Sequence, residues 1–268
     1  EGFKAEKNTA SKQIAQLEGE SKQEAIKAMQ AVDSRQEAVE KELASVLEEY
    51  NDLMLRVPAI ISEDTPIGQD DSQNVEIKQV GDIPAFDFPV QDHVTLGQKL
   101  GIIDLERGAK VAGSRSYFLI GDGARLEQAL IKYAQDFIAR RGYDLMTVPI
   151  LLNKEALIGA GFFPGHEEET YRIEKDDKYL VGTSESSICG FHADEIIDES
   201  KLPIRYAGIS SCFRREAGSY GKDTHGLYRV HQFNKVEQFV FCKNDEEESK
   251  RMFNELLNNA EEFLQSLN

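Results

Sequence analysis

The chain has 268 residues, of which 40% are hydrophobic and 29% are charged, so it is long enough to bury a sizeable core and has a globular composition. Its formal net charge of -17 excludes a protein that holds nucleic acid through a generally basic surface, because such affinity comes from neutralised phosphates. No apolar run reaches membrane-spanning length and the first residues are too polar for a signal peptide, which indicates a cytoplasmic protein. The three cysteines, Cys189, Cys212 and Cys242, are too far apart for a metal motif and are expected to be reduced thiols.

Residues 1–57 carry the pattern of an antiparallel helical hairpin. Between Lys22 and Val57 there is no Pro or Gly, and apolar residues recur at alternating spacings of 4 and 3, which is typical of a coiled-coil seam. The letters EGES at 18–21 predict the turn that joins this helix to a shorter one before it. Half of the longer seam is therefore expected to lack a partner, so N-terminal residues are missing or another segment covers it. Spacing alone leaves a dimerising coiled coil open.

A connector and a second domain are expected in residues 58–268. Pro58 ends the arm, and Thr65–Gly81, rich in Asp, Gln, Asn and Gly, predicts a connector with a short strand at Val75–Val80. The stretch that follows Gly121 predicts an amphipathic helix, with Asp122 as the N-cap and Gly142 as the stop.

The remaining elements predict an α+β fold. The run after Gly142 is strand-like but contains Pro149, which cannot donate to a ladder, so this strand belongs at a sheet edge or against a partner. Further strands are expected at Tyr179–Gly182, Arg205–Phe213 and Tyr228–Phe241, and helices at Glu185–Glu195 and Glu246–Leu267. Because hairpins outnumber βαβ units, we expect a mixed, mostly antiparallel sheet flanked by helices.

The last two strands should form a hairpin around a long loop at Ala217–Gly226. Alternate side chains on a strand share a face, so Arg229, Phe233 and Glu237 should project together, about 13 Å apart in turn. Arg214 and Glu216 on the other strand also share a face. Arg229 offers an anion clamp, Phe233 a flat stacking surface and Glu237 a carboxylate, in this order along the strand. Together they indicate a ligand that carries phosphate, a base and an amine.

Over nearly the whole chain, these motifs resemble those of the seryl-tRNA synthetase family. Its members are class II aminoacyl-tRNA synthetases. The helix and strand that end at Pro149 resemble class II motif 1, and GTSE at Gly182–Glu185 resembles the family's TxE serine-binding loop. Phe213–Gln238 resembles motif 2, the most specific of these signals. The hairpin of residues 1–57 resembles the tRNA-binding arm, so residues 58–268 would be the connector and part of the catalytic domain.

The resemblance implies a serine–tRNA ligase: ATP-dependent activation of L-serine to seryl-adenylate, then transfer to tRNA(Ser), in a homodimer built on motif 1. Arg214 would be the catalytic residue, holding the α-phosphate of ATP and the serine carboxylate. Glu216 would accept from the adenine amino group, and Arg229 would hold the distal phosphates. The implied ATP-binding set is Arg214, Glu216, Arg229, Val230 and Phe233, and the implied serine-binding set is Thr183, Glu185, Arg214 and Glu237. Thr183 and Glu185 would receive the ammonium, and Glu237 the hydroxyl.

The chain also departs from the family pattern. Ser184 stands where many relatives carry alanine and Arg215 stands at a variable place, and neither is expected to change a contacting group. Motif 3 and the family's metal-ligating acidic residue should follow motif 2, but nothing after Phe241 resembles them. We therefore expect the chain to be part of a longer protein with an incomplete arm, and the ligand of the Mg²⁺ that accompanies ATP to lie outside it.

Other interpretations remain open. Phe233 could be a core residue, Arg229 with Glu237 an ordinary cross-strand ion pair, and His225, His231 and Lys235 residues without catalytic duty. The chain could also be a truncated or non-catalytic synthetase-derived protein that binds tRNA or ATP, or an amino acid:carrier-protein ligase. Relatives of the carrier-protein type lack a long helical arm, so residues 1–57 favour tRNA.

Overall fold

The computed structural model describes residues 2–217 and 225–267. Two compact units, Glu1–Val75 and Glu76–Asn268, make up the chain. Within the described residues, none of the helices combines the length and the apolar character needed to cross a lipid bilayer.

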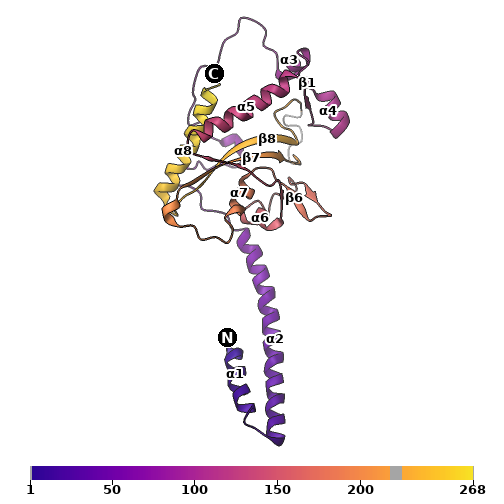
Figure 1. Ribbon diagram of the computed structural model, residues 1–268, viewed down its shortest axis with the longest axis vertical. Helices are drawn as coiled ribbons and strands as arrows, with labels where there is room; N and C mark the ends of the chain where they lie inside the picture. Colours follow the sequence, from indigo (N-terminus) through magenta and orange to yellow (C-terminus); the bar gives the residue numbers. More distant parts are fainter. Residues whose placement is uncertain (1, 218–224, 268) are drawn as a thin grey trace. The chain divides into compact units, whose positions relative to one another are not determined.

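The first unit is built on a helical hairpin of α1 (Gly2–Ile14) and α2 (Gly19–Leu55), whose two helices run side by side in opposite directions (Figure 1). An ion pair joins Lys7 to Asp33 at 2.5 Å, and the guanidinium of Arg35 lies 5.4 Å from the ring centre of Phe3. The turn between the two helices lies earlier in the chain than the EGES letters at 18–21 predict, because α1 ends at Ile14 and α2 already begins at Gly19.

The second half of α2 keeps its apolar seam exposed within the chain. The apolar residues of this half are between 47% and 57% exposed: Val39, Leu43, Val46, Leu47, Tyr50 and Leu53. Val32, which α1 covers, is only 8% exposed. The seam beyond α1 is thus uncovered by the described residues, as the alternating spacing predicted.

The connector after α2 is irregular apart from a short 3-10 helix, η1 (Asp71–Gln73), which Asp70 caps by accepting a hydrogen bond from the Ser72 backbone at 2.9 Å. The predicted strand at Val75–Val80 is wrong, since these residues form no strand. Val75 and Ile77 are 62% and 89% exposed, so no neighbouring strand packs there to share a ladder.

Three small sheets organise the second unit, and their strands are mostly antiparallel. The central sheet has the order β3 (Asp144–Thr147), β7 (Ile204–Phe213), β8 (Gln232–Phe241), with β3 parallel to β7 and β7 antiparallel to β8. The second sheet has the order β4 (Leu151–Leu152), β6 (Lys178–Leu180), β5 (Arg172–Ile173), and the third pairs β1 (Ile103–Asp104) with β2 (Phe118–Leu119). The α+β prediction is confirmed. The run after Gly142, predicted as one strand that contains Pro149, is instead divided into β3 and β4, which belong to different sheets, and Pro149 lies between them in neither strand.

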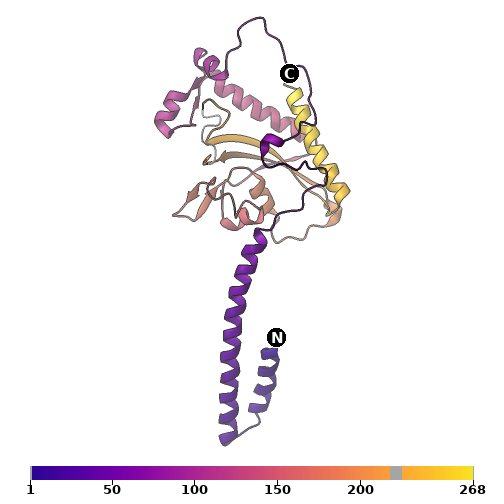
Figure 2. The same ribbon diagram turned by 180° about the vertical axis from the view of Figure 1, so that it is seen from behind.

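Helices cover both faces of the central sheet. The helices of the second unit are α3 (His93–Lys99), α4 (Leu105–Ala112), α5 (Asp122–Ala139), α6 (Lys154–Gly159), α7 (Glu185–Phe191), the 3-10 helix η2 (Glu199–Lys201) and α8 (Glu246–Gln265). In Figures 1 and 2, α5 and α8 lie on one side of β7 and β8, and α6 and α7 lie on the other. On the first side Ile138, Tyr143 and Ala207 form a buried cluster, against which Val236 and Leu256 pack.

Several predicted element ends shift. The N-cap of α5 is Gly121, with φ 55°, rather than Asp122, whose side chain instead pairs with Arg125 at 3.0 Å. Helix α7 ends at Phe191 rather than at residue 195, because the chain turns away there. Strand β8 begins at Gln232, four residues after the predicted start. Of the predicted loop at 217–226, residues 218–224 lie outside the described residues.

Arg205 fastens α8 to the central sheet. Its Nε and Nη2 donate to the two carboxylate oxygens of Glu255 at 2.7 and 2.9 Å, and the Tyr143 hydroxyl donates to the same carboxylate at 3.0 Å. Side chains of Arg205 and Glu255 are 23% and 29% exposed, so the pair is partly shielded from water. Burial and this hydrogen bond raise the pKa of Tyr143 to about 12.

We expect Glu255→Gln to lower the free energy of unfolding at pH 7 by about 1 to 3 kcal/mol, because Arg205 loses a charge-assisted partner. The hydrogen bond from Arg205 lowers the pKa of Glu255. This contribution is therefore fully present above the pKa of the unfolded carboxyl, and is lost as the pH falls through the lower folded pKa. Urea titrations of both proteins at neutral and acidic pH measure the difference, which should shrink with falling pH.

Glu246→Gln is the matched control, because Glu246 forms an exposed pair with Lys250 on the same helix. It should have little effect at any pH. A difference between the native protein and Glu255→Gln that stays constant into acid would contradict the expectation.

Candidate active site

The register of β7 and β8 fixes which residues face each other across the site. Cys212 pairs with Phe233, and Gly208 pairs with Glu237. Past the ends of the strands the pairing continues, since the Arg214 backbone donates to the His231 carbonyl at 3.0 Å and a ring nitrogen of His231 lies 2.9 Å from the Arg214 carbonyl. These two contacts of His231 therefore hold the backbone of Arg214 in place.

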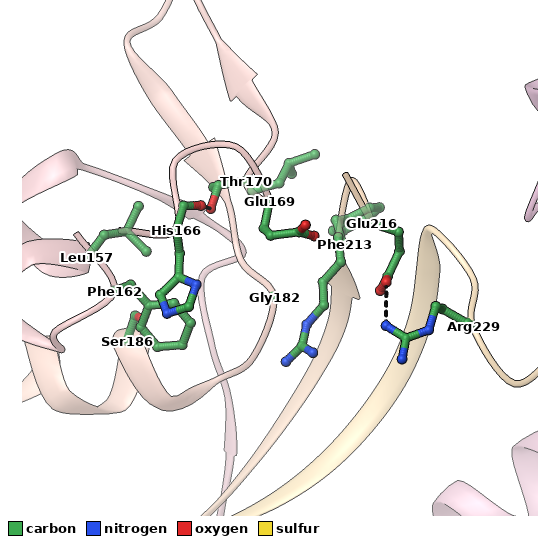
Figure 3. Close-up of a pocket in the computed structure, with 12 residues that line it drawn as sticks. Leu157, Phe162, His166, Glu169, Thr170, Gly182, Ser186, Phe213, Glu216 and Arg229 are labelled. Atoms are coloured by element: carbon green, nitrogen blue, oxygen red, sulfur yellow. Dashed lines mark hydrogen bonds and ion pairs between the residues drawn. The ribbon is translucent and has the colours of Figure 1, made fainter. Parts of the chain in front are cut away.

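A cavity of about 390 Å³ opens beside this end of the hairpin. Figure 3 shows Phe162, His166 and Ser186 on one side of it, and Glu216 and Arg229 on the other. Three of the predicted site residues line the cavity: Arg214, Glu216 and Arg229. Phe162 and His166 were not predicted, and their letters carried no signal.

Glu216 and Arg229 form an ion pair on the cavity wall. Arg229 Nη1 lies 2.8 Å from Glu216 Oε2, and the two side chains are 39% and 8% exposed. The backbone of Glu216 has φ 56°, a value that a non-glycine residue rarely adopts. On the other side of the pair, Arg115 donates to the Arg229 carbonyl at 3.2 Å. The alternative pairing of Arg229 with Glu237 is wrong, because Arg229 precedes β8 in irregular backbone and its side chain contacts Glu216. The predicted shared face therefore holds for Phe233 and Glu237 but not for Arg229.

Arg214 is an exposed cation at the cavity. A Cβ added at Gly182 would lie 3.3 Å from Arg214 Nε, so the guanidinium lies close against the glycine backbone. The guanidinium carbon of Arg214, Cζ, lies 5.9 Å from the ring centre of the partly buried Phe233, and Lys235 Nζ also lies 5.9 Å from that centre. Among the residues that the structure describes, none forms an ion pair with Arg214. Its charge is thus available to an anion, in a place where a flat ring is adjacent.

A carboxylate subsite adjoins the cavity beyond Gly182. Glu237 accepts from the Thr183 hydroxyl, with Oε1 at 2.5 Å, and its Oε2 accepts from the Ser184 backbone at 2.8 Å and the Ser184 hydroxyl at 2.6 Å. Thr183 and Ser184 are 3% and 0% exposed. The Ser184 hydroxyl, which alanine lacks, thus binds Glu237, a contact that the sequence did not predict.

Glu185 begins α7 next to this subsite. Burial raises the pKa of the Glu185 carboxyl above its ordinary value, and the negative charge of Glu237 raises it further. Two carboxylates at one place favour a cationic ligand, since a positive charge would relieve both the burial and the mutual repulsion.

Val230 is 7% exposed, and His225 is exposed. Burial raises the pKa of the Cys212 thiol, which makes it a poor nucleophile. In residues 2–217 and 225–267 no group of three or more His, Cys, Asp or Glu side chains could hold a metal ion, so these residues form no all-protein metal cluster.

Comparison with known families matches two parts of the chain. Residues 1–61 match the seryl-tRNA synthetase N-terminal domain, and residues 169–268 match the tRNA synthetase class II core domain (G, H, P, S and T). The serine–tRNA ligase of Nitrosopumilus maritimus is 41% identical over 267 residues, which are 99% of this chain and 63% of the relative. That of Pseudarthrobacter chlorophenolicus is 46% identical over 92% of this chain and 58% of the relative.

The chain belongs to the seryl-tRNA synthetase family. It spans about 63% of the length of the first of these relatives. The crystal structure of seryl-tRNA synthetase from Pyrococcus horikoshii complexed with ATP is similar, with a TM-score of 0.86 and 32% identity over 98% of this chain and 64% of that one. The cytoplasmic serine–tRNA ligase of Naegleria fowleri in complex with AMP has a TM-score of 0.81 and 35% identity over 99% of this chain and 63% of that one.

Gly208 is a position where the synthetase fold leaves no room for a side chain. A Cβ there would lie 2.3 Å from Ser184 Oγ and 2.8 Å from Ile188 Cδ1. We expect Gly208→Ala to lower the free energy of unfolding by about 1 to 3 kcal/mol, because β7 and α7 must separate. Urea denaturation measures the loss. Gly190→Ala is the control.

At Gly190 the added Cβ would meet only the Ala156 methyl, at 3.7 Å, and the residue lies within α7. Because alanine favours helix over glycine, this control should be neutral or stabilising by up to about 1 kcal/mol. Equal stability of Gly208→Ala and Gly190→Ala would contradict the close packing of Ser184 on β7.

Proposed function

We propose that the protein activates L-serine with ATP to form seryl-adenylate and transfers the serine to tRNA(Ser). The observation that carries the proposal is the adjacency of two different subsites at the β7–β8 hairpin. One presents the cation Arg214 beside the Phe233 ring, and the other presents the carboxylates Glu185 and Glu237. Family membership supports the same chemistry.

In the proposed ATP subsite, Arg214 holds the α-phosphate, where its guanidinium fork suits two oxygens. Phe233 stacks on the adenine, which the backbone of Val230 also contacts. Glu216 accepts from the adenine amino group and Arg229 holds the distal phosphates, so the ion pair between these two side chains has to open when ATP binds. The binding of ATP by the similar Pyrococcus enzyme supports this assignment.

In the proposed serine subsite, Thr183 and Glu185 receive the ammonium and Glu237 accepts from the hydroxyl. The raised pKa of Glu185 supports a cationic ligand at this place. As an oxygen of the serine carboxylate attacks the α-phosphorus, a bond to it forms and the bond to pyrophosphate breaks. Arg214 stabilises the negative charge that gathers on the phosphoryl oxygens. Mg²⁺ would accompany the phosphates, and the described residues hold no group of three or more His, Cys, Asp or Glu side chains that could bind it.

The proposed partners include tRNA and a second copy of the chain. The hairpin of α1 and α2 lies within the match to the seryl-tRNA synthetase N-terminal domain, which supports a tRNA-binding arm. On α5 and β3, which carry motif 1, Leu126, Leu130 and Leu145 are 68%, 43% and 42% exposed, which supports a homodimer. The proposed reaction also implies the cytoplasm, and the free thiols at Cys189, Cys212 and Cys242 are compatible with a reducing compartment.

We expect Glu237→Gln in the natural protein to raise the KM for serine in ATP–pyrophosphate exchange by about 10- to 150-fold, the value of a charge-assisted hydrogen bond. The KM for ATP should change little, because Glu237 lies outside the ATP subsite. Glu174→Gln, an exposed change in the same unit, is the control and should leave both constants unaltered. Equal rises for serine and ATP would sink the assignment of Glu237 to the serine hydroxyl.

Deleting residues 1–57 from the natural protein should abolish tRNA charging and leave pyrophosphate exchange largely intact. The arm belongs to a separate compact unit and supplies no residue to the cavity that binds ATP in this proposal. Parallel assays of exchange and of serine transfer to tRNA measure the two steps. Charging that survives the deletion would remove the tRNA-binding role from the arm.

A further inference from the structure

Ser184 occupies the N-cap position of α7 but does not cap the helix. Serine at this position ordinarily accepts a hydrogen bond from a backbone N–H in the first turn. Here the Ser184 side chain makes no such bond, and its hydroxyl donates to Glu237 Oε2 at 2.6 Å. Ser184 is 0% exposed, so its hydroxyl makes this hydrogen bond away from water.

The donors around Glu237 are divided unevenly between its two oxygens. Oε2 accepts from the Ser184 backbone at 2.8 Å and from the Ser184 hydroxyl, while the one proton of the Thr183 hydroxyl lies within reach of both oxygens. Among the described residues, Oε1 has only the Thr183 hydroxyl at 2.5 Å, and Lys235 Nζ at 3.9 Å. Because an ionised carboxylate has about four acceptor sites on its two oxygens, Oε2 is saturated and Oε1 keeps capacity for one more donor.

Packing holds Ser184 in this position. Gly208 lies opposite Glu237 in the β7–β8 register, and a Cβ at Gly208 would lie 2.6 Å from Ser184 Cβ. The missing side chain at Gly208 thus makes the space that the Ser184 side chain fills. Glu237 and Ser184 are brought together from positions 53 residues apart by the sheet and α7.

We infer that Ser184 is a positioning residue of the serine subsite, whose hydroxyl holds Glu237 so that Oε1 is turned to the substrate hydroxyl. This rests on the proposed function and deepens it. The terminal torsion of a glutamate is broad, so the carboxylate needs fixed donors to present one chosen oxygen. The Ser184 backbone N–H and the Thr183 hydroxyl supply two of them, and the Ser184 hydroxyl supplies the third.

The test is ATP–pyrophosphate exchange by the natural protein with Ser184→Ala, which keeps the backbone donor and removes the hydroxyl. We expect the KM for serine to rise about three- to tenfold, since one of three donors is lost, while the KM for ATP stays unchanged. Ser187→Ala is the matched control. It makes the same chemical change in the same helix and loses a bond from its hydroxyl to the Pro149 carbonyl at 2.8 Å, away from Glu237. Both constants should stay at native values in this control.

Ser184→Cys adds a second measurement that does not depend on how well the alanine variant folds. Its thiol has nearly the same shape and donates only weakly, so the KM for serine should lie between those of the native protein and Ser184→Ala. An unchanged KM for serine in both variants, or equal rises for serine and ATP, would overturn the inference. A natural protein without serine-dependent exchange would overturn the proposed function and this inference together, whereas an active protein indifferent to Ser184 would overturn the inference alone.

Discussion

Ten residues of β7 pair in unbroken register with ten of β8, and both subsites depend on that ladder. It sets Gly208 against Glu237, which leaves space for Ser184, and it ends where Arg214 meets His231. A slip of one residue would turn Glu237 to the opposite face of the sheet, where α5 and α8 pack. The helices on the two faces therefore do more than cover a core, because they penalise a one-residue slip, which would turn the carboxylate away from α7.

Periodicity predicted the elements well and their ends poorly. Alternation along β8 placed Phe233 and Glu237 on one face, whereas the single strand predicted around Pro149 is divided there into β3 and β4. The same alternation extended the strand back over Arg229, where the letters remain strand-like but the backbone is irregular. Side-chain pattern does not encode where a partner strand stops, and the end of a ladder depends on that partner. The connector at Val75–Val80 failed for the related reason that a strand-like stretch with no neighbour does not form a strand.

Motif resemblance supplied the candidate site residues, but it could not supply their mutual contacts. The pairing of Glu216 with Arg229, and that of Ser184 with Glu237, join residues whose separation in sequence carries no signal of proximity. Ser184 was the more deceptive case, because a serine at the start of a helix has an ordinary explanation as a cap. Only the geometry shows that its hydroxyl is directed elsewhere. The requirement for glycine at position 208 is equally invisible without the neighbours that crowd it.

The contact between Glu216 and Arg229 makes the ATP subsite of the proposed enzyme selective for a ligand that binds both side chains. With the side chain of Glu216 only 8% exposed, a ligand that attracts Arg229 alone takes one charged partner away from a shielded carboxylate and offers that carboxylate nothing in return. Inorganic pyrophosphate is such a ligand, and adenosine, which offers only the amino group, has the opposite deficiency. A nucleotide that carries both groups compensates both side chains at once. Discrimination against partial ligands would thus arise from a bond between two protein residues, with no extra contact to any of the molecules rejected.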